Sequence, residues 1–237
     1  SENSMKLAIM QPYLFPYIGY FQLMNAVDKF VVYDDVTFIK KGWINRNNIL
    51  VNGRSHRFTI PLKNASQNVL IKDLELSITE KWKNGFFNTI KHSYSKAPFF
   101  NNTISIIENV INTDSNFILD WHLKSFELIK TYLNIGTKIV KTSSIYNNQE
   151  LKGQYRIMDI CLKERTKFYL NPIGGKELYE SGLFHKNGII LNFINSESIR
   201  YSQFGNQFIP SLSIIDVMMF NSVEAIKEML KLYKVSE

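Results

Sequence analysis

The amino-acid sequence predicts an α/β protein with a mostly parallel, Rossmann-like sheet, and three observations support this fold class. The chain of 237 residues is 45% hydrophobic, which is enough to bury a full core. An apolar stretch at residues 6–10 predicts a buried strand, and residues 17–27 predict a helix. The β-rich run at 29–33 completes a strand–helix–strand unit, which implies parallel strands joined by a right-handed crossover.

A β-hairpin is expected after this unit. Two apolar runs at 47–51 and 54–60 flank the dipeptide Asn52-Gly53, which is a strong hairpin signal in this position. Pro61 ends the second run. Residues 71–76 alternate between apolar and polar side chains, and therefore predict one more strand.

The pattern becomes helical at Thr79, which we interpret as an N-cap. Aromatic and apolar side chains then recur at helical spacing, and Pro98 ends this helix. Two further helices are expected at about 99–112 and 115–134. We therefore predict an α/β core at 5–78 and 136–237 and a helical insertion at 79–135, within a single compact unit.

Strands and helices alternate again in the remainder of the chain. The predicted strands are 138–140, 167–170 and 188–194, and the predicted helices are 150–165, 212–220 and 222–233. A turn at 171–176 enters a short helix. Ser213 is expected to cap the helix that follows it, and Met218 and Met219 are expected in the core.

Composition narrows the class of protein. The single cysteine, Cys161, excludes an intrachain disulfide framework and a cysteine-rich zinc site, and the residues predict no metal site. We find no signal peptide and no apolar run near 18 residues, so we expect a soluble, cytoplasmic protein without a transmembrane segment. Ser1 to Ser4, which precede Met5, are interpreted as a remnant outside the fold.

The formal net charge is +7, with lysines spread along the whole chain. No recognition motif supports nucleic-acid binding, so we predict no nucleic-acid partner. Attraction to an anionic small substrate or to anionic lipids is compatible with this charge. A solvated, lysine-rich surface without functional meaning is the simplest alternative.

The most informative motif follows the first strand. Pro12 and Pro16 exclude regular structure in the loop that follows, and Gly19 falls in the first turn of the next helix. Such a helix start offers unpaired N–H groups and a positive dipole end to phosphate or carboxylate, so α/β proteins often bind ligands there. The loop and helix start carry more polar groups than a structural turn needs: Gln11, Tyr13, Tyr17 and Tyr20.

A second candidate cluster follows the second strand. The carboxyl ends of neighbouring parallel strands share one edge of a sheet, so Asp35 should lie near the first motif. Arg46, flanked by Asn45 and Asn47, can clamp a phosphate or carboxylate. Trp43 offers a stacking face for a base or a sugar. Strand-end capping and surface charge are the structural alternative for Asp35.

Two further candidates lie later in the chain. His92, preceded by Lys91, has the side chain best suited to a general base near neutral pH, although most histidines are structural. Gly174-Gly175-Lys176 follows a strand and precedes a helix, as in a minimal phosphate-binding turn, and Tyr179 is close to it in sequence. The turn lacks the full Walker pattern.

These motifs together resemble those of the WbqC-like proteins. They run in order along nearly the whole chain and read Gln11-Pro12-Tyr13-x-x-Pro16-Tyr17-x-Gly19-Tyr20, Asp28-x-Phe30-Val31, Asp34-Asp35-Val36, Gly42-Trp43-x-Asn45-Arg46-Asn47, Lys91-His92, Gly174-Gly175-Lys176-x-Leu178-Tyr179 and Leu212-Ser213-Ile214-Ile215-Asp216. The resemblance implies a bacterial protein whose gene occurs with O-antigen, lipopolysaccharide and nucleotide-sugar genes. It also implies a suggested transfer of glycine or another amino acid to a sugar.

A second resemblance concerns one motif. Tyr17-Ile18-Gly19-Tyr20 occupies the position where HIGH-type nucleotidyltransferases carry His-x-Gly-His. Both histidines are replaced by tyrosine here, which removes the imidazoles that stabilise phosphates in those enzymes. Nucleotidyl transfer or adenylate formation is therefore kept as an alternative function.

The leading expectation is an N-acyltransferase that moves an acyl or aminoacyl group to the amine of a nucleotide-linked amino sugar. The expected catalytic groups are His92 or Asp35 as the base, with Tyr13 and Gln11 at the oxyanion or donor. The expected substrate-binding residues are Tyr17, Gly19, Tyr20, Trp43, Asn45, Arg46, Asn47, Lys91, Gly174, Gly175, Lys176 and Tyr179. The cofactor stays open, with an acyl donor carried on coenzyme A or on a carrier protein as the candidate. A non-catalytic binding or scaffold protein of a polysaccharide-assembly complex is the runner-up.

Overall fold

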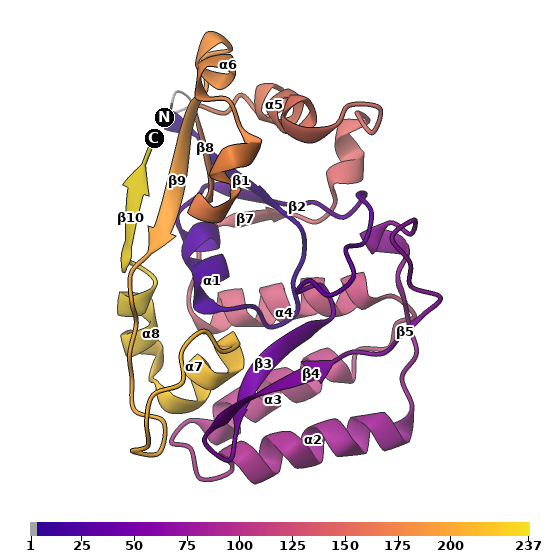
Figure 1. Ribbon diagram of the computed structural model, residues 1–237, viewed down its shortest axis with the longest axis vertical. Helices are drawn as coiled ribbons and strands as arrows, with labels where there is room; N and C mark the ends of the chain where they lie inside the picture. Colours follow the sequence, from indigo (N-terminus) through magenta and orange to yellow (C-terminus); the bar gives the residue numbers. More distant parts are fainter. Residues whose placement is uncertain (1–3) are drawn as a thin grey trace.

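A six-stranded sheet forms the centre of the computed structural model, which describes residues 4–237, so residues 1–3 of the N-terminal remnant lie outside the described part. The strand order is β10-β9-β8-β1-β2-β7, and every neighbouring pair is parallel except β10 with β9 (Figure 1). The strands are β1 (Lys6–Met10), β2 (Lys29–Val32), β7 (Lys138–Val140), β8 (Phe168–Pro172), β9 (Ile190–Ser196) and β10 (Tyr233–Ser236). The predicted α/β class with a mostly parallel sheet is confirmed.

The strand order reverses between β1 and β8. From β1 the chain passes through α1 (Ile18–Asn25) to β2 on one side, whereas β8 and β9 pair on the other side of β1. In open α/β sheets, ligands bind at the carboxyl ends of the strands where the order reverses. The topology therefore points to the end of β1, immediately before the loop at 11–17.

Both faces of the sheet are buried, as expected for parallel strands. Leu7 and Ile9 of β1 pack in one apolar cluster with residues of α5 (Gly153–Lys163) and α6 (Ser181–Lys186). Ala8 of β1 belongs to the larger cluster on the opposite face, which holds residues of α1 and α4 (Ile118–Tyr132). We call these the α5 face and the α1 face.

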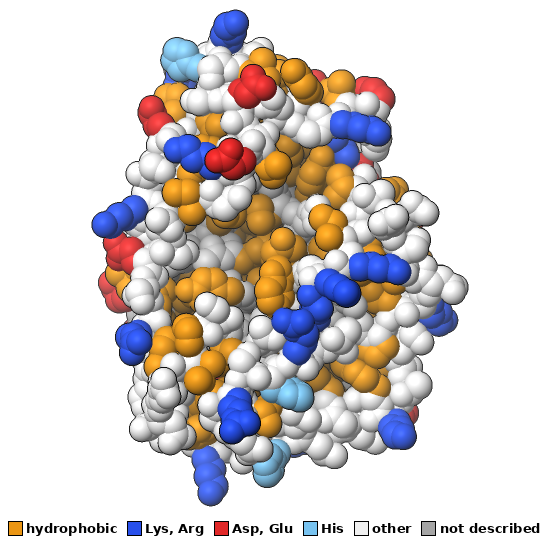
Figure 2. Space-filling view, viewed as in Figure 1, with side chains coloured by type: hydrophobic (Ala, Val, Ile, Leu, Met, Phe, Trp, Pro, Cys, Tyr) orange, Lys and Arg blue, Asp and Glu red, His pale blue; other side chains and the backbone are white. Residues whose placement is uncertain are grey.

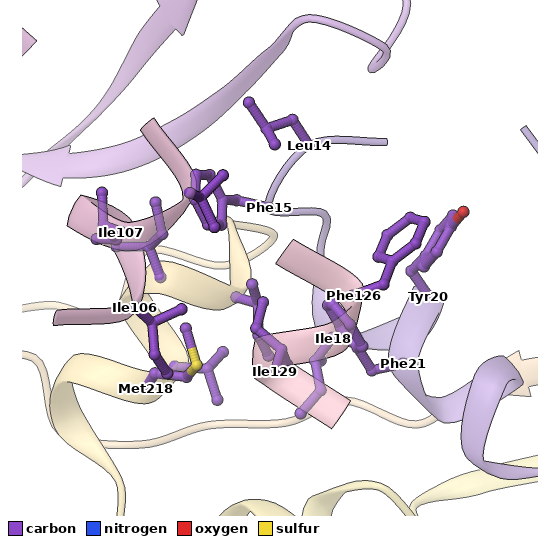
Figure 3. Packing of buried hydrophobic residues seen from close by; sticks show 14 of the residues in the cluster. Leu14, Phe15, Ile18, Tyr20, Phe21, Ile106, Ile107, Phe126, Ile129 and Met218 are labelled. Atoms are coloured by element: carbon purple, nitrogen blue, oxygen red, sulfur yellow. The ribbon is translucent and has the colours of Figure 1, made fainter. Parts of the chain in front are cut away.

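The loop before α1 is anchored in the larger cluster. Figure 3 shows Phe15 and Ile18 among side chains of three other helices, with Tyr20 beside Phe126. The rings of Tyr20 and Phe126 are stacked with centroids 5.5 Å apart. Because Leu14 and Phe15 are fully buried, the loop has a fixed path although it is neither helix nor strand.

The helical block lies below the sheet in Figure 1, with the hairpin of β3 (Arg46–Val51) and β4 (Arg54–Thr59) against it. Its helices are α2 (Glu80–Tyr94), α3 (Phe100–Ile111) and α4, and Thr79 caps α2 by accepting a hydrogen bond from the N–H of Trp82 at 3.1 Å. Their buried residues and those of α1 form one continuous cluster. The division into an α/β core and a helical insertion stays a prediction.

The predicted hairpin is confirmed, because β3 and β4 pair antiparallel around a turn in which Asn52 and Gly53 have φ values of 51° and 73°. These left-handed conformations suit asparagine and glycine. The remaining elements are β5 (Leu62–Lys63), η2 (Ile71–Asp73), β6 (Glu75–Leu76), η3 (Ser143–Tyr146), η4 (Ile173–Leu178), α7 (Ile214–Phe220) and α8 (Val223–Met229).

One predicted element is wrong in type, and another is correct in type but ends too late. Residues 71–76 form the short helix η2 followed by the two-residue strand β6, and a 3₁₀ turn lets Ile71 and Leu74 both be buried. The helix predicted at 222–233 ends at Met229, and Tyr233–Ser236 become the edge strand β10 because β9 offers an unpaired backbone edge. The predicted helix at 150–165 is confirmed in type and starts later, at Gly153, which has a φ of 57°.

Candidate functional site

A pocket of about 280 Å³ lies where the strand order reverses, at the carboxyl ends of β1, β8 and β9. Figure 2 shows a hollow over this region with hydrophobic side chains around it. The lining residues are mostly aromatic or aliphatic, with several hydroxyl groups and one amide: Met10, Tyr13, Pro16, Tyr17, Gly19, Tyr20, Leu23, Trp43, Asn47, Pro172, Ile194, Ser196 and Ser211.

The first turn of α1 borders this pocket. Tyr17 is the N-cap, and its side chain makes no hydrogen bond to the helix, which leaves the first backbone N–H groups without a side-chain cap. Gly19 is tightly enclosed, since a Cβ atom there would lie 3.0 Å from Ser196 Oγ and 3.2 Å from Tyr17 Cδ1. Glycine therefore allows Ser196 and Tyr17 to pack closely against this helix start, and a larger residue would push them aside.

Backbone strain marks both sides of the pocket. Phe15 has a φ of 46° and Ser211 a φ of 61°, in the left-handed region that non-glycine residues rarely adopt. Hydrogen bonds from the start of α7 hold the loop in place: Ser213 Oγ donates to the carbonyl of Phe15 at 2.6 Å, and the N–H of Ile214 donates to that of Pro16 at 2.8 Å. Such strain persists only where the surroundings enforce it, and it is concentrated at functional sites.

The phenol groups of the pocket are neutral hydrogen-bonding groups at neutral pH. Burial raises the pKa of both Tyr13 and Tyr17 above the ordinary value of tyrosine. Burial and the nearby Tyr13 raise the pKa of Tyr20 further. The hydroxyl of Tyr20 is already used, because it donates to the backbone carbonyl of Gln11 at 2.8 Å.

Trp43 forms the outer wall of the pocket, and its side chain is 38% exposed. The guanidinium carbon of Arg57 lies 5.9 Å from the centroid of the Trp43 ring. Arg46 supports the same loop from behind, where its Nε donates to the carbonyl of Gly42 at 2.9 Å and its Nη2 donates to that of Lys41. The pocket thus combines an apolar interior with a basic rim.

The model of the WbqC-like protein family matches residues 11–228, which covers the pocket and nearly the whole chain. The chain belongs to the WbqC-like protein family. It is 24% identical over 223 residues to a protein of Mycobacterium tuberculosis named uncharacterized protein Rv1507c, and the match covers 93% of this chain and 95% of that protein. No solved structure matches this WbqC-like protein significantly.

The structure brings six of the expected site residues of this WbqC-like protein to one pocket: Tyr13, Tyr17, Gly19, Tyr20, Trp43 and Asn47. Gln11 adjoins the pocket through its backbone carbonyl, which Tyr20 binds. Asn45 and Arg46 flank it, but Asn45 Nδ2 donates to the carbonyl of Ile60 at 3.0 Å, so its side chain supports the hairpin.

Asp35, which was expected near the pocket as a base, forms a buried ion pair with Arg156. Arg156 Nη2 donates to both carboxylate oxygens of Asp35, at 2.8 and 2.7 Å, and both side chains are buried. Burial alone would raise the pKa of Asp35, but hydrogen bonds from Arg156 and Ser143 outweigh it and hold the pKa below the usual range. A carboxylate in this state is a weak base.

The glycine turn supports the α5 face of the sheet. A Cβ atom on Gly175 would lie 2.4 Å from Asn171 Oδ1, so this glycine makes room for a buried asparagine. Lys176 Nζ lies 5.6 Å from the ring centroid of Phe193, and Tyr179 packs with the α5-face cluster. Gly174 lies in the same short helix, η4, and none of these four candidates lines the pocket.

His92 lies on α2 and lines a different cavity, of about 680 Å³, beside the hairpin turn and the loop at 204–207. Its neighbour Lys91 is exposed on the same helix. The structure therefore does not bring His92 together with Tyr13 or Gly19. His92 therefore cannot serve as the base for a group held in this pocket, because α2 packs against β3, away from the strand ends.

Sequence reasoning missed three residues around the pocket. Ser196 ends β9, and the rule that ligands lie at carboxyl ends of parallel strands could have identified it. Ser211 lines the pocket from the loop before α7. Arg57 does not line it, but the hairpin register, in which Arg57 pairs with Asn48, places it beside Trp43. No local sequence signal distinguishes either of them.

Two other kinds of feature are absent from residues 4–237. This part of the chain holds no group of three or more His, Cys, Asp or Glu side chains that could bind a metal ion. Within the same residues, no helix is both long enough and apolar enough to cross a bilayer.

Proposed function

We propose that this WbqC-like protein binds a nucleotide-linked amino sugar in the pocket at the reversal of strand order. It then transfers an acyl or aminoacyl group to the amine of this sugar during surface-polysaccharide biosynthesis. The observation that carries the proposal is the position of the pocket, at the reversal of strand order where α/β proteins bind nucleotide ligands. The family resemblance supports the substrate class.

The size and lining of the pocket suit the sugar ring of such a ligand. A volume of about 280 Å³ is at the lower end of the roughly 300–1,000 Å³ typical of ligand sites. Aromatic walls with hydroxyl tips suit a sugar ring, which has apolar faces and polar edges. We therefore place the amino sugar in the pocket and the rest of the nucleotide outside it.

Basic side chains at the edge of the pocket suit the diphosphate of a nucleotide-linked sugar. Figure 2 shows Lys and Arg side chains beside the hollow, on the side of β3 and β4. Arg57 is exposed there next to Trp43, and Lys40 and Lys41 are exposed on the same loop. Guanidinium groups bind phosphate oxygens by charge-assisted hydrogen bonds.

The transfer itself is a substitution at a carbonyl carbon. The amine nitrogen attacks that carbon, a C–N bond forms, and the bond to the sulfur or oxygen of the carrier breaks. The proton lost by nitrogen ends on the leaving group. Among the described lining residues there is no Asp, Glu, His, Lys or Arg, so the amine would have to react in its neutral form.

The same absence of charge among the described lining residues favours a second candidate, a binding protein of a polysaccharide-assembly complex that holds the amino sugar without reaction. Nucleotidyl transfer has weaker support. Tyr20, at the second histidine position of the HIGH-type motif, is buried and bonded to Gln11.

A binding and turnover experiment separates these functions. Calorimetry with UDP-, GDP- and dTDP-linked sugars, each with a free amine or an acetylated amine, identifies the ligand. A ligand at about 100 times its dissociation constant stabilises the protein by roughly 2.7 kcal/mol, which thermal denaturation detects. Mass spectrometry after addition of acetyl-coenzyme A, or of glycine with ATP, then tests transfer. Binding without product favours the binding protein, and release of pyrophosphate from ATP favours adenylate chemistry.

Trp43→Ala provides the test of the pocket. We expect a loss of affinity of about two- to tenfold, because stacking on an aromatic ring contributes about 0.5–1.5 kcal/mol. Trp82→Ala is the matched control, since Trp82 lies on α2 and stacks on Phe86 with centroids 5.2 Å apart. Equal affinities in both variants would contradict binding in this pocket.

A further inference from the structure

The side chain of Asn47 has a free donor in a buried position. Asn47 is 4% exposed, belongs to β3 and lines the pocket. Its Oδ1 accepts the N–H of Asn48 at 2.8 Å, which fixes the orientation of the amide. No group among the described residues accepts a hydrogen bond from its Nδ2, and this atom is not among the fully enclosed polar atoms that lack partners. The amide N–H₂ is therefore open to the pocket.

Asn47 is 4% exposed, so its unpaired N–H₂ group has little contact with water, and a polar group in this position is costly without a hydrogen-bond acceptor. Buried polar groups in proteins are almost always paired, with protein, water or ligand. In Asn47 the acceptor atom is satisfied by the backbone and the donor atom is not. This asymmetry indicates a ligand that supplies an acceptor.

The start of α1 provides a second, independent set of donors in the same pocket. Tyr17 and Gly19 line it, and the N-cap side chain makes no bond to the helix. The N–H of Tyr20 donates to the carbonyl of Tyr17 at 3.0 Å, which leaves the N–H groups of Ile18 and Gly19 for a ligand at the positive end of the helix dipole.

The uncharged lining of the pocket indicates which chemical group of the ligand binds there. Lysine and arginine are absent from the described lining residues, so a dianionic phosphate would lack a counter-charge inside the pocket. Aspartate and glutamate are absent too, so nothing among these residues repels negative charge. Neutral donors without a counter-charge suit a carbonyl or a single carboxylate.

We propose that Asn47 Nδ2 and the N–H groups of Ile18 and Gly19 at the start of α1 together bind the carbonyl oxygen of the acyl group. This inference rests on the proposed function and assigns its acyl subsite. As the amine nitrogen attacks, the C–N bond forms and negative charge develops on this oxygen. The electron pair on this oxygen then re-forms the C=O double bond as the bond to the carrier breaks. The leaving group takes the proton lost by nitrogen. Removing one such donor lowers kcat by about 10²–10³ in other enzymes.

The test uses Asn47→Asp, which keeps the size of the side chain and an oxygen for the Asn48 N–H but replaces the donor by an acceptor. Asn48→Asp is the control, because it makes the same change one residue later, where the side chain accepts from Arg57 Nε at 3.3 Å. Acetate and acetamide are titrated as probes by ligand-detected nuclear magnetic resonance. We expect both probes to bind wild type and Asn48→Asp, and to bind Asn47→Asp at least tenfold more weakly.

Equal binding by Asn47→Asp, or no binding of either probe by wild type, would overturn the oxygen site. Thermal denaturation accompanies each titration, and Asn47→Ala carries the same expectation if Asn47→Asp does not fold. The two proposals fail separately. Transfer with an unchanged kcat in Asn47→Asp would refute the oxygen site alone, and probe binding that depends on Asn47 without any acylated amino sugar would refute the transfer alone.

Discussion

Arg156 binds both carboxylate oxygens of Asp35, at 2.8 and 2.7 Å, across the end of β2. The two residues are 121 positions apart, and each side chain is almost completely buried. The guanidinium also lies 5.0 Å from the ring centroid of Tyr33 and donates from Nε to Asn148 Oδ1 at 3.0 Å. This network ties the end of β2 to α5, so Asp35 serves to hold the strand end in place.

Asp35→Asn should therefore destabilise the protein strongly. It leaves the buried charge of Arg156 without a counter-charge, which typically costs about 3–5 kcal/mol. Urea denaturation at pH 7 measures this loss. Glu228→Gln, which removes an exposed pair with Lys231, is the control and should change stability by less than about 0.5 kcal/mol. Similar small effects in both variants would contradict a structural role for Asp35.

His122 should make the fold sensitive to mild acid. It is fully buried on α4, and Nε2 lies 2.7 Å from the carbonyl oxygen of Ile44. Burial lowers its pKa from 6.5 to about 4, with a smaller opposing effect from the Ile44 carbonyl. The unfolded chain gains the proton below pH 6.5 and the folded chain only below about 4, so stability is complete above pH 6.5 and falls as the pH falls to 4.

The expected loss is about 2 kcal/mol by pH 5 and roughly 3 kcal/mol by pH 4. Comparison with His122→Gln isolates this loss of stability, because glutamine can donate a hydrogen bond to the carbonyl of Ile44 but does not titrate. Urea denaturation of both proteins between pH 7 and pH 4 should show the wild type losing its advantage. His56→Gln, at an exposed position of β4, should follow the wild type. Parallel curves for wild type and His122→Gln would show that His122 is not responsible.

Tyr94 and Tyr201 offer a matched test of the carboxylate of Asp216. Both hydroxyls donate to it, at 2.8 and 2.6 Å, but Tyr94 also accepts the buried N–H of Leu50 at 2.8 Å. Tyr94→Phe removes two hydrogen bonds and should cost about 2–3 kcal/mol, whereas Tyr201→Phe removes one and should cost about 1 kcal/mol. Chemical denaturation gives both values. A larger cost for Tyr201→Phe would contradict this assignment.

Gly19 and Gly85 form a matched pair of helical glycines. A Cβ atom on Gly85 would meet nothing within 4 Å, so Gly85→Ala should stabilise the protein by about 0.5–1 kcal/mol. Gly19→Ala should not, because its Cβ would press on Ser196 Oγ, which already donates to Gln22 Oε1 at 2.5 Å. Thermal denaturation should show that adding Ser196→Ala recovers part of the loss. An equal gain from both alanines would refute this packing argument.

Local patterns in the sequence predicted most of the elements. The continuous apolar stretch that contains Leu7, Ala8 and Ile9 indicated a buried strand, and Asn52-Gly53 indicated the hairpin, because both signals depend on neighbouring residues only. The strand β10 was missed, since residues 233–236 pair with β9, from which α7 and α8 separate them in the sequence, and have no strong strand pattern of their own. Long-range pairing decided their conformation.

The candidate site also has one part that the sequence predicts and one part that depends on the tertiary structure. The sequence alone determined that residues 11–20 form a loop and a helix start after a strand, and so placed Tyr13, Tyr17 and Gly19 at a ligand-binding position. Only the tertiary structure decided which distant residues join them, because strand order and helix packing bring Asn47 and Ser196 to the pocket and take His92 elsewhere. It also decided that Asp35 is an ion-pair partner, since its state depends on Arg156, which a helix far along the chain supplies.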